Sequence, residues 1–303
     1  MTLVAITGGT GFVGQAVLEE ANRREMSLRA LARGEQGARG GVAWIKGDLA
    51  DTAALARLCD GADAVIHIAG AVNLPTREEF AAVNIAGTQA AVDAARAAGV
   101  RRFVHVSSLA AREPGLSDYG WSKRMAEEVV QVSGLDWTIV RPPAIYGPRD
   151  REILELFRAA RWRVVPMPPA GGRASILQVD DLARLLLDLV PAASASQRIF
   201  EPDDGQPGGW EHRALAREIG AAVGKNVWAP QVPGAVLSAA ARLDRLVRGK
   251  QAKLTPDRAR YIAHPDWVSD PARAVPRELW QPLIATPDGL RATAQWYRAA
   301  DWL

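Results

Sequence analysis

The sequence predicts an α/β protein: a Rossmann-like, doubly wound parallel sheet with a smaller, mainly helical C-terminal lobe. Short runs of almost continuous apolar residues alternate with helical patterns through the first half of the 303 residues, as in a parallel sheet covered on both faces. A glycine-rich turn separates the first strand from the first helix. The second half carries proline-rich loops and helical patterns instead. Right-handed crossovers between the strands then favour the doubly wound arrangement.

The first half supplies the predicted sheet. Strands are expected where apolar, often β-branched residues run together, and helices where apolar residues recur at helical spacing. The predicted strands span 3–7, 28–33, 42–48, 62–70, 101–108 and 137–143, and the predicted helices span 12–24, 52–59, 79–99 and about 119–133. This alternation is typical of βαβ units joined into one sheet.

The second half is predicted to add helices and loops around a substrate. Helices are expected over 179–190, 210–224 and 233–249, with loops at 165–172 and 201–209. Thr255 followed by Pro256 predicts another helix start, because threonine is a good N-cap and proline suits the first helical position. We expect a first domain over 1–145, continued by 174–200, and a substrate-side lobe over 146–173 and 201–303.

Composition and charge argue against several classes of protein. The net charge is +3 and the arginines are spread along the chain, so no nucleic-acid partner is predicted. No apolar run is long enough to span a bilayer, and the N-terminal residues lead straight into a strand, so we expect a cytoplasmic protein without a membrane partner. Cys59 is expected to be a buried, inert thiol, and no metal site is predicted. The arginine-rich segment 149–163 is expected to be a solvated helix rather than an anion site.

The stretch "TGGTGFVG" predicts a dinucleotide-binding turn between the first strand and the first helix. Gly8 permits a tight turn, Gly11 lets the backbone approach a pyrophosphate, and Gly14 permits close helix–strand packing. Thr10, Phe12 and Val13 complete the turn and the start of the helix. The N–H groups and the positive dipole end of that helix then suit the phosphates.

The end of the second strand predicts which dinucleotide binds. An NAD-binding unit usually places an Asp or Glu there, whereas this chain has Arg33, and the next acid is Glu35. A guanidinium suits the 2′-phosphate of NADP, with Arg29 or Arg39 as a possible second contact. The alternative is that Arg33 merely ends a strand in solvent. We favour NADP(H) over NAD(H).

Three polar residues predict the chemistry. Ser108 ends a strand, at the sheet edge where ligands of open α/β sheets bind. Tyr119 and Lys123 stand four residues apart on the next helix and so share a face. A nearby ammonium and an oxidised nicotinamide would both lower the pKa of a phenol. Tyr119 would then act as general acid or base, Lys123 would also bind the nicotinamide ribose, and Ser108 would orient the substrate oxygen.

Together these stretches resemble the extended or atypical short-chain dehydrogenases/reductases, of the NAD(P)-dependent epimerase/dehydratase and dihydroflavonol-reductase-like kind. The resemblance covers most of the chain and includes "GDLAD", "HIAG", "NIAGT", "HVSS", "RPPAIYGPRD" and "VDDLA", besides the glycine turn and the Tyr119–Lys123 pair. The C-terminal "DGLRATAQWY" is similar to the last helix of the family. A homodimer is a further expectation that the resemblance raises.

The resemblance implies roles for further residues. Asp48 and Leu49 would line the adenine, Ala69 and Gly70 would pass beside the ribose and pyrophosphate, Asn84 would support the active site, and Pro143 would touch the nicotinamide carboxamide. Each of three residues also has a purely structural alternative. Asp48 suits a helix cap, Asn84 a buried helix polar group, and His67 a packed strand residue rather than a catalyst.

Departures from the family pattern narrow the function. "SSLAA" follows the catalytic strand where dehydratases carry Thr-Asp-Glu, and "RASILQVDDLA" places Arg173 one position off the epimerase pattern. We therefore expect an NADP(H)-dependent oxidoreductase that transfers a hydride to or from a small, fairly apolar carbonyl or alcohol. The alternatives are a nucleotide-sugar epimerase and a non-catalytic NAD(P)-binding regulator. Trp162, Met167 and Trp210 are more readily explained by core packing than by a substrate pocket.

Overall fold

The computed structural model describes residues 2–249 and 254–303, which divide into two compact units. The first unit contains the residues up to Pro142 together with Leu182–Glu201 and Val275–Gln281. The second unit contains Pro143–Asp181, the described part of Pro202–Ala274, and Pro282–Leu303. The assignment of nucleotide and substrate roles to separate domains stays a prediction.

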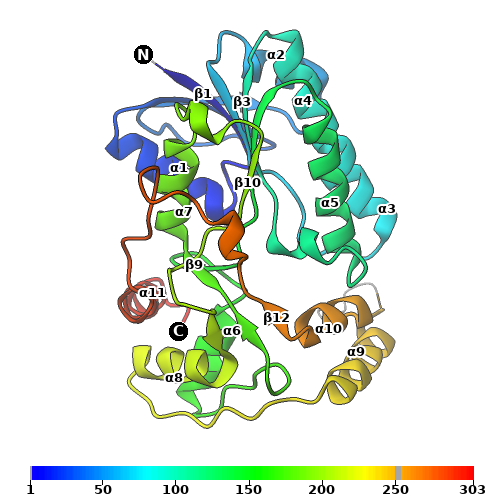
Figure 1. Cartoon of the computed structure of the whole chain (residues 1–303), viewed down its shortest axis with the longest axis vertical. Coiled ribbons are helices and arrows are strands. Elements are labelled where there is room, and N and C mark those ends of the chain that lie inside the picture. Colours follow the sequence, from blue (N-terminus) through cyan, green and yellow to red (C-terminus); the bar gives the residue numbers. More distant parts are fainter. Residues whose placement is uncertain (1, 250–253) are drawn as a thin grey trace. The chain divides into compact units, whose positions relative to one another are not determined.

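A seven-stranded sheet forms the centre of the first unit (Figure 1). Its strands are β1 (Leu3–Thr7), β2 (Ser27–Ala32), β3 (Val42–Lys46), β4 (Ala64–His67), β5 (Arg102–Val106), β6 (Asp136–Val140) and β10 (Arg198–Phe200). Neighbouring strands all pair in parallel, in the order β10-β6-β5-β4-β1-β2-β3. The strand order reverses between β1 and β4, and ligands of open α/β sheets bind beyond the carboxyl ends of the strands at such a point.

Helices cover both faces of this sheet, as predicted. Figure 1 shows α1 (Phe12–Arg23) on one side and α2 (Thr52–Cys59), α4 (Gly87–Ala97) and α5 (Asp118–Gln131) on the other. Apolar side chains of α2 and α4, such as Leu58 and Ala95, pack on sheet residues such as Val65 and Phe103, and all four are fully buried. The near-continuous burial of β4 and β5 explains why these strands read as apolar runs in the sequence.

The predicted helix over 79–99 is present but is not a regular α-helix. It begins as α3 (Arg77–Phe80), widens into a π-helical stretch at Ala81–Ala86, and continues as α4. A π-helical turn accommodates an extra residue and is often found at functional sites. Asn84, one of the predicted site residues, lies in this stretch.

The second unit combines helices with short strands that the sequence did not predict. The helices are α6 (Leu154–Arg161), α8 (His212–Ala222), α9 (Gly234–Arg248), α10 (Pro256–Ala263) and α11 (Thr286–Ala299), and α7 (Val179–Asp188) enters the first unit at Leu182. The strands are β7 (Ala144–Tyr146) paired with β9 (Ile176–Gln178), and β8 (Arg173–Ala174) between β11 (Trp210–Glu211) and β12 (Asp266–Trp267). Two- and three-residue strands are too short to show an alternating pattern.

A second hydrophobic core lies among α6, α8 and α11. Phe157 and Tyr297 are fully buried, with ring centroids 5.3 Å apart. Met167 and Trp210 pack in this core as expected, whereas Trp162 is 85% exposed, so the expectation of core packing was wrong for Trp162. At α10, Oγ1 of Thr255 accepts a hydrogen bond from the N–H of Arg258, which confirms the predicted N-cap.

Candidate active site

The glycine turn after β1 lies against the loop after β4. Gly8 has a positive φ of 77°, and a Cβ on it would lie 2.7 Å from the backbone nitrogen of Ala69. A Cβ on Gly14 would lie 2.1 Å from the carbonyl oxygen of Gly8. Side chains are therefore excluded at both positions. Gly14 packs on the backbone of the turn itself rather than on a strand, which differs from the role we expected for it.

The start of α1 is open to an anion. Gly11 is the N-cap, no side chain caps the helix, and its first turn contains no acidic residue. Thr10 and Gly11 are exposed, and Phe12 and Val13 are partly exposed. The positive end of the helix dipole is therefore not neutralised by a side chain in its first turn, so this end of the helix suits a phosphate.

Arg33 lies just beyond β2 and is exposed, without a hydrogen bond or ion pair to any residue that the structure describes. The two predicted assisting arginines are engaged elsewhere. Arg29 donates to the carbonyl oxygens of Leu58 and Asp60 at the end of α2. Arg39 donates to Gln15 at 2.7 Å and pairs with Glu19 on α1. Arg33 therefore stands as the exposed cation at the end of β2.

The loop after β3 carries two aspartates, Asp48 and Asp51, which have different roles. Asp51 is the N-cap of α2, where its carboxylate accepts from the N–H of Ala54 at 2.9 Å. Asp48 accepts only from the nearby N–H of Ala50, and its side chain is exposed. The helix-cap alternative for Asp48 is therefore wrong. Leu49 is partly buried beneath Gly87, whose Cβ would lie 2.6 Å from it.

Tyr119 and Ser108 are brought together at the carboxyl end of β5. Ser117 caps α5, and Gly120 lets the helix approach its neighbour, because a Cβ there would lie 2.7 Å from the carbonyl oxygen of Ala110. The hydroxyl group of Ser108 lies near enough to that of Tyr119 to influence its pKa as a hydrogen-bonding neighbour. The ring of Phe80 lies 6.2 Å from that of Tyr119, centroid to centroid. Gly120 is a site-shaping residue that the sequence reasoning missed.

The pKa of Tyr119 differs from the sequence expectation. Burial raises it above its ordinary value, and the neighbouring Ser108 hydroxyl opposes that rise. We expected Lys123 to lower it. The ammonium of Lys123 is instead directed to the carbonyl oxygen of Val106, at 2.8 Å. In the protein without cofactor, Tyr119 is thus a protonated phenol at neutral pH.

Lys123 is buried, with 5% of its surface exposed. Burial lowers the pKa of its ammonium to about 8, and the nearby charge of Glu127 opposes that shift. A Cβ on Gly70 would lie 3.7 Å from Nζ of Lys123, so the loop after β4 passes directly beside the ammonium. The ammonium of Lys123 therefore lies between β5 and the loop that carries Ala69 and Gly70.

Asn84 fastens the same loop to α5. Its Oδ1 accepts from the N–H of Ala71 at 2.7 Å, and its Nδ2 donates to the carbonyl oxygen of Ala71 at 3.0 Å and to Oγ of Ser122 at 2.8 Å. Ser122 Oγ in turn donates to the carbonyl oxygen of Tyr119. Both N–H donors of Asn84 and one lone pair of its Oδ1 are thus taken up by protein groups, which fits a role in positioning the site.

A buried ion network supports α5 from below, and the sequence reasoning did not find it. Arg141 donates to both carboxylate oxygens of Glu127, at 2.8 and 2.6 Å, and to Glu201 at 3.2 Å. Ser107 donates to Glu127 at 2.5 Å. Glu127 and Glu201 are 0% and 1% exposed, and Glu127 lies four residues after Lys123. The sequence did contain a signal for this network, because an acid four residues after a lysine lies on the same face of the helix.

Two histidines lie in the sheet beneath the site. His67 bonds Thr7 through Nδ1 at 2.8 Å and Thr88 through Nε2 at 3.1 Å, and burial lowers its pKa to about 3. It is a packed, neutral strand residue, as expected. His105 stacks on it at 5.4 Å between ring centroids. Both ring nitrogens of His105 are buried without a hydrogen-bond partner among the described residues.

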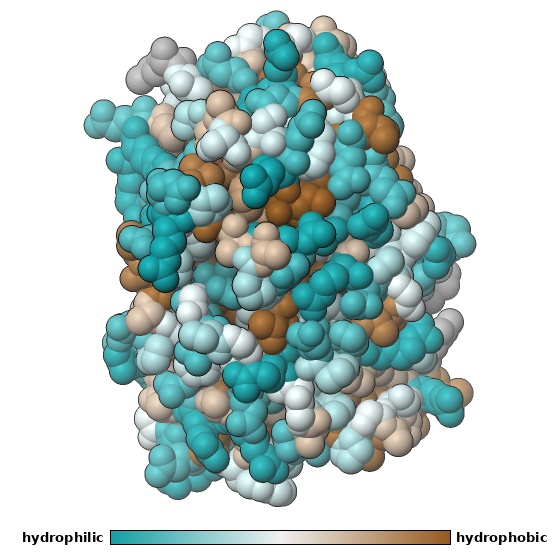
Figure 2. All heavy atoms as spheres, viewed as in Figure 1, coloured by the Kyte–Doolittle hydropathy of each residue, from teal (hydrophilic) through white to brown (hydrophobic). Residues whose placement is uncertain are grey.

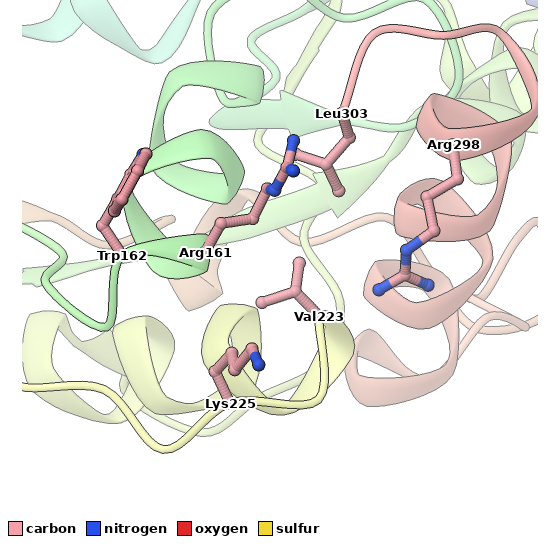
Figure 3. Close-up of a pocket in the computed structure, with 6 residues that line it drawn as sticks. All are labelled: Arg161, Trp162, Val223, Lys225, Arg298 and Leu303. Atoms are coloured by element: carbon pink, nitrogen blue, oxygen red, sulfur yellow. The ribbon is translucent and has the colours of Figure 1, made fainter.

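The remaining predicted residue, Pro143, lies at the start of the second unit, just before β7. That unit contains a cavity of about 510 Å³, lined by Arg161, Trp162, Val223, Lys225, Arg298 and Leu303 (Figure 3). None of the predicted catalytic or cofactor residues lines this cavity. The polar residues just described, and not this cavity, therefore form the candidate active site.

The described residues contain neither a metal-binding cluster nor a membrane-spanning helix. No group of three or more His, Cys, Asp and Glu side chains is arranged to hold a metal ion. No described helix has both the length and the apolar character needed to cross a membrane. Cys59 is buried, and burial raises its pKa to about 11, as expected for an inert thiol.

Similarity to known proteins assigns this chain to a family. A family model described as NAD(P)H-binding matches residues 8–189. A "Ceramide reductase" of Caulobacter vibrioides is 36% identical over 99% of this chain and 96% of its own length. The chain is an extended short-chain dehydrogenase/reductase. It is an NAD(P)-dependent enzyme of that superfamily, and several of its relatives in sequence are named reductases.

Other members of the superfamily resemble this chain more distantly. A "4-hydroxy-2-methyl-3-oxo-4-farnesyl-3,4-dihydroquinoline-1-oxide ketoreductase" of Stigmatella aurantiaca is 28% identical over 84% of this chain and 89% of its own. The solved UDP-glucose 4-epimerase of Thermus thermophilus, in complex with NAD, superposes with a TM-score of 0.69 at 22% identity, covering 99% of this chain and 100% of the other. This structural likeness shows the shared fold.

The ion network generates a prediction about stability. Arg141→Met should lower the free energy of unfolding by about 3–5 kcal/mol, because two buried carboxylates lose their guanidinium. Arg124→Met, which removes an exposed partner of Glu128 on the same helix, should cost less than about 1 kcal/mol. Urea unfolding of both variants measures the difference. Equal losses would contradict the importance that we give to the buried network.

The burial of Lys123 generates a prediction about pH. Because its pKa falls from 10.5 to about 8 on folding, the unfolded chain binds more protons than the folded one between these values, so the contribution of Lys123 to stability rises with pH there. Lys123→Met lacks this dependence. The unfolding free energy of the wild type, minus that of the variant, should therefore increase from about pH 7.5 to about pH 9.5. A flat or falling difference in urea titrations would show that the ammonium is not desolvated.

Proposed function

We propose that this reductase transfers a hydride between NADP(H) and a fairly apolar ketone or alcohol, with Tyr119 as general acid or base. The observation that carries the proposal is the proximity of the Tyr119 and Ser108 hydroxyl groups at the carboxyl end of β5, with the buried ammonium of Lys123 one helical turn further along α5. Two hydroxyl groups are thereby directed to one place at the edge where cofactors of this fold bind.

The residues around the glycine turn fit a dinucleotide. Gly8 and Gly14 leave no room for side chains, and the open N-terminus of α1 suits a pyrophosphate. Asp48 and Leu49 would hold the adenine, and Ala69 and Gly70 would lie beside the ribose. When bound, the nicotinamide supplies or accepts the hydride. Lys123 would bind the nicotinamide ribose, and Pro143 would contact the carboxamide, as the family resemblance implies.

Proton transfer is the part of the chemistry that this chain's own residues perform. A phenol whose pKa is raised by burial holds its proton at neutral pH, so Tyr119 is in the right state to protonate a carbonyl oxygen as the hydride arrives. Ser108 would donate to the same oxygen and stabilise its developing charge. The protonated phenol is the state that reduction requires, whereas oxidation would require the phenolate.

The substrate and the direction are supported by the relatives. Both sequence relatives described above are named as reductases; ceramide is a lipid, and the second name contains a farnesyl group. We therefore propose a ketone that carries a long apolar group, larger than the small substrate that the sequence suggested. An epimerase would regenerate its cofactor in each turnover, so net consumption of NADPH separates the two activities. A homodimer and a cytoplasmic location stay predictions.

Tyr119→Phe should reduce the turnover of a long-chain ketone by about 10²–10⁴-fold, because proton donation is lost. The affinity for NADPH should change little, since the phenol is not needed to hold the dinucleotide. Oxidation of NADPH, followed by its absorbance, measures the first, and fluorescence titration measures the second. Arg124→Met, at a partly exposed position on the same helix, is the control and should retain full turnover. An active Tyr119→Phe enzyme would refute the proposed role.

Arg33→Asp should weaken NADPH binding about tenfold or more while leaving NADH binding similar or improved, because a 2′-phosphate would lose its cation. Arg101→Asp is a matched control. It makes the same charge change at an exposed arginine just before β5, at the opposite edge of the sheet. Fluorescence titrations with both cofactors give the ratio. An unchanged NADPH/NADH preference in Arg33→Asp would contradict the assignment of NADP.

A further inference from the structure

Helix α9 (Gly234–Arg248) exposes four of its five large apolar residues, and the fifth, Leu237, is only partly buried. Val236, Leu243, Leu246 and Val247 are 54%, 61%, 83% and 73% exposed. Ala241, in contrast, is completely buried, and so is Ala259 of the adjoining helix α10 at 1% exposure. An ordinary surface helix of a water-soluble protein has the opposite arrangement, with its leucines and valines against the core.

The exposed apolar residues form one continuous face. At about 100° per residue, an arc of about 140° holds Ala235, Val236, Ala239, Ala240, Leu243, Leu246 and Val247, all of them exposed. We call this surface the α9 face. Isolated exposed apolar residues need no explanation, but a contiguous face of them marks an interaction site. In Figure 2, pale and brown spheres lie at the lower right, over α9.

Charges border the α9 face. Arg242 follows directly on one edge, is exposed, and has no ion-pair partner among the described residues. The other edge carries Asp244, whose carboxylate pairs with the exposed Arg248 at 3.3 Å. An apolar helix face with Arg242 on one edge and a neutral ion pair on the other complements the surface of an anionic bilayer, where acyl chains lie beneath negative headgroups. A second copy of the same face would instead bring its own arginines up against these.

We propose that the α9 face docks this enzyme onto anionic membranes, where its substrate resides. The substrate part of this inference rests on the proposed function, since a ketone with a long apolar group partitions into bilayers and is scarce in water. The docking is peripheral. It revises the sequence expectation of no membrane partner, which rested on the absence of a run that could span a bilayer.

The experiment is flotation of the full-length protein with vesicles of phosphatidylcholine alone or mixed with phosphatidylglycerol. The wild type should float with the mixed vesicles and at least fivefold less with phosphatidylcholine alone. The double variant Leu243→Glu/Val247→Glu should lose at least tenfold in its partition onto mixed vesicles. Arg242→Glu should lose less, and its loss should disappear at high salt.

Val132→Glu is the matched control, because Val132 is 85% exposed just after α5 in the first unit and is not part of the α9 face. It should float like the wild type. NADPH binding, and turnover of a short, water-soluble ketone, should be the same in the double variant as in the wild type, whereas turnover of a long-chain ketone embedded in vesicles should fall. This split also reports that the double variant is folded.

Three outcomes would overturn the docking proposal. The first is a wild type that fails to float with the mixed vesicles, and the second is a double variant that floats as well as the wild type. The third is a wild-type dimer that becomes a monomer in the double variant with no difference in flotation, which would assign the α9 face to a second copy. A wild type that floats but reduces neither ketone would refute the proposed function and leave the membrane contact standing.

Discussion

A lysine ammonium buried at the carboxyl end of β5 constrains the rest of the site. Lys123 satisfies one of its donors at the carbonyl oxygen of Val106 and is balanced by Glu127 one turn further along α5. A carboxylate that is itself buried needs a partner, and Arg141 provides it with two hydrogen bonds while also holding Glu201. Each buried charge thus requires the next one, because an unpaired charge in the interior is far more costly than a paired one. The result is a rigid base beneath α5 that fixes the direction in which its first turn points.

Glycines shape the site as much as the buried charges do. Gly8 admits the loop after β4, Gly70 lies against Asn84 and Lys123, and Gly120 lets α5 approach the turn after β5. At each of these places a Cβ would meet backbone or side-chain atoms at 3.1 Å or less. Loops that follow different strands of the sheet therefore converge on one edge only because their closest residues carry no side chain. Backbone contacts, which tolerate little movement, set the spacing between the dinucleotide turn and the hydroxyl pair.

The sequence predicted the parts of this arrangement that depend on local pattern. The strands and helices of the first half, the glycine turn, the cap at Thr255 and the neutral role of His67 all follow from spacing and residue type. The pKa of Tyr119 did not, because it depends on which way the Lys123 ammonium turns and on how deeply the phenol lies. The hydrogen bonds of the Arg29 guanidinium could not be predicted either, because their acceptors are backbone carbonyl oxygens at the end of a helix far along the chain. Contacts between distant segments, and strands of two residues, leave no periodic signal in a single sequence.

The wide turn at Ala81–Ala86 has a consequence for the two ends of its helix. An inserted residue rotates everything after it by about 100° around the helix axis. Before the turn, Phe80 faces the ring of Tyr119; after it, Thr88 faces His67 and donates back to the carbonyl oxygen of Asn84. A regular α-helix through this segment would keep one of these two alignments and lose the other. One residue of extra length thus lets a single helix serve both the interior of the sheet and the rim where the chemistry takes place.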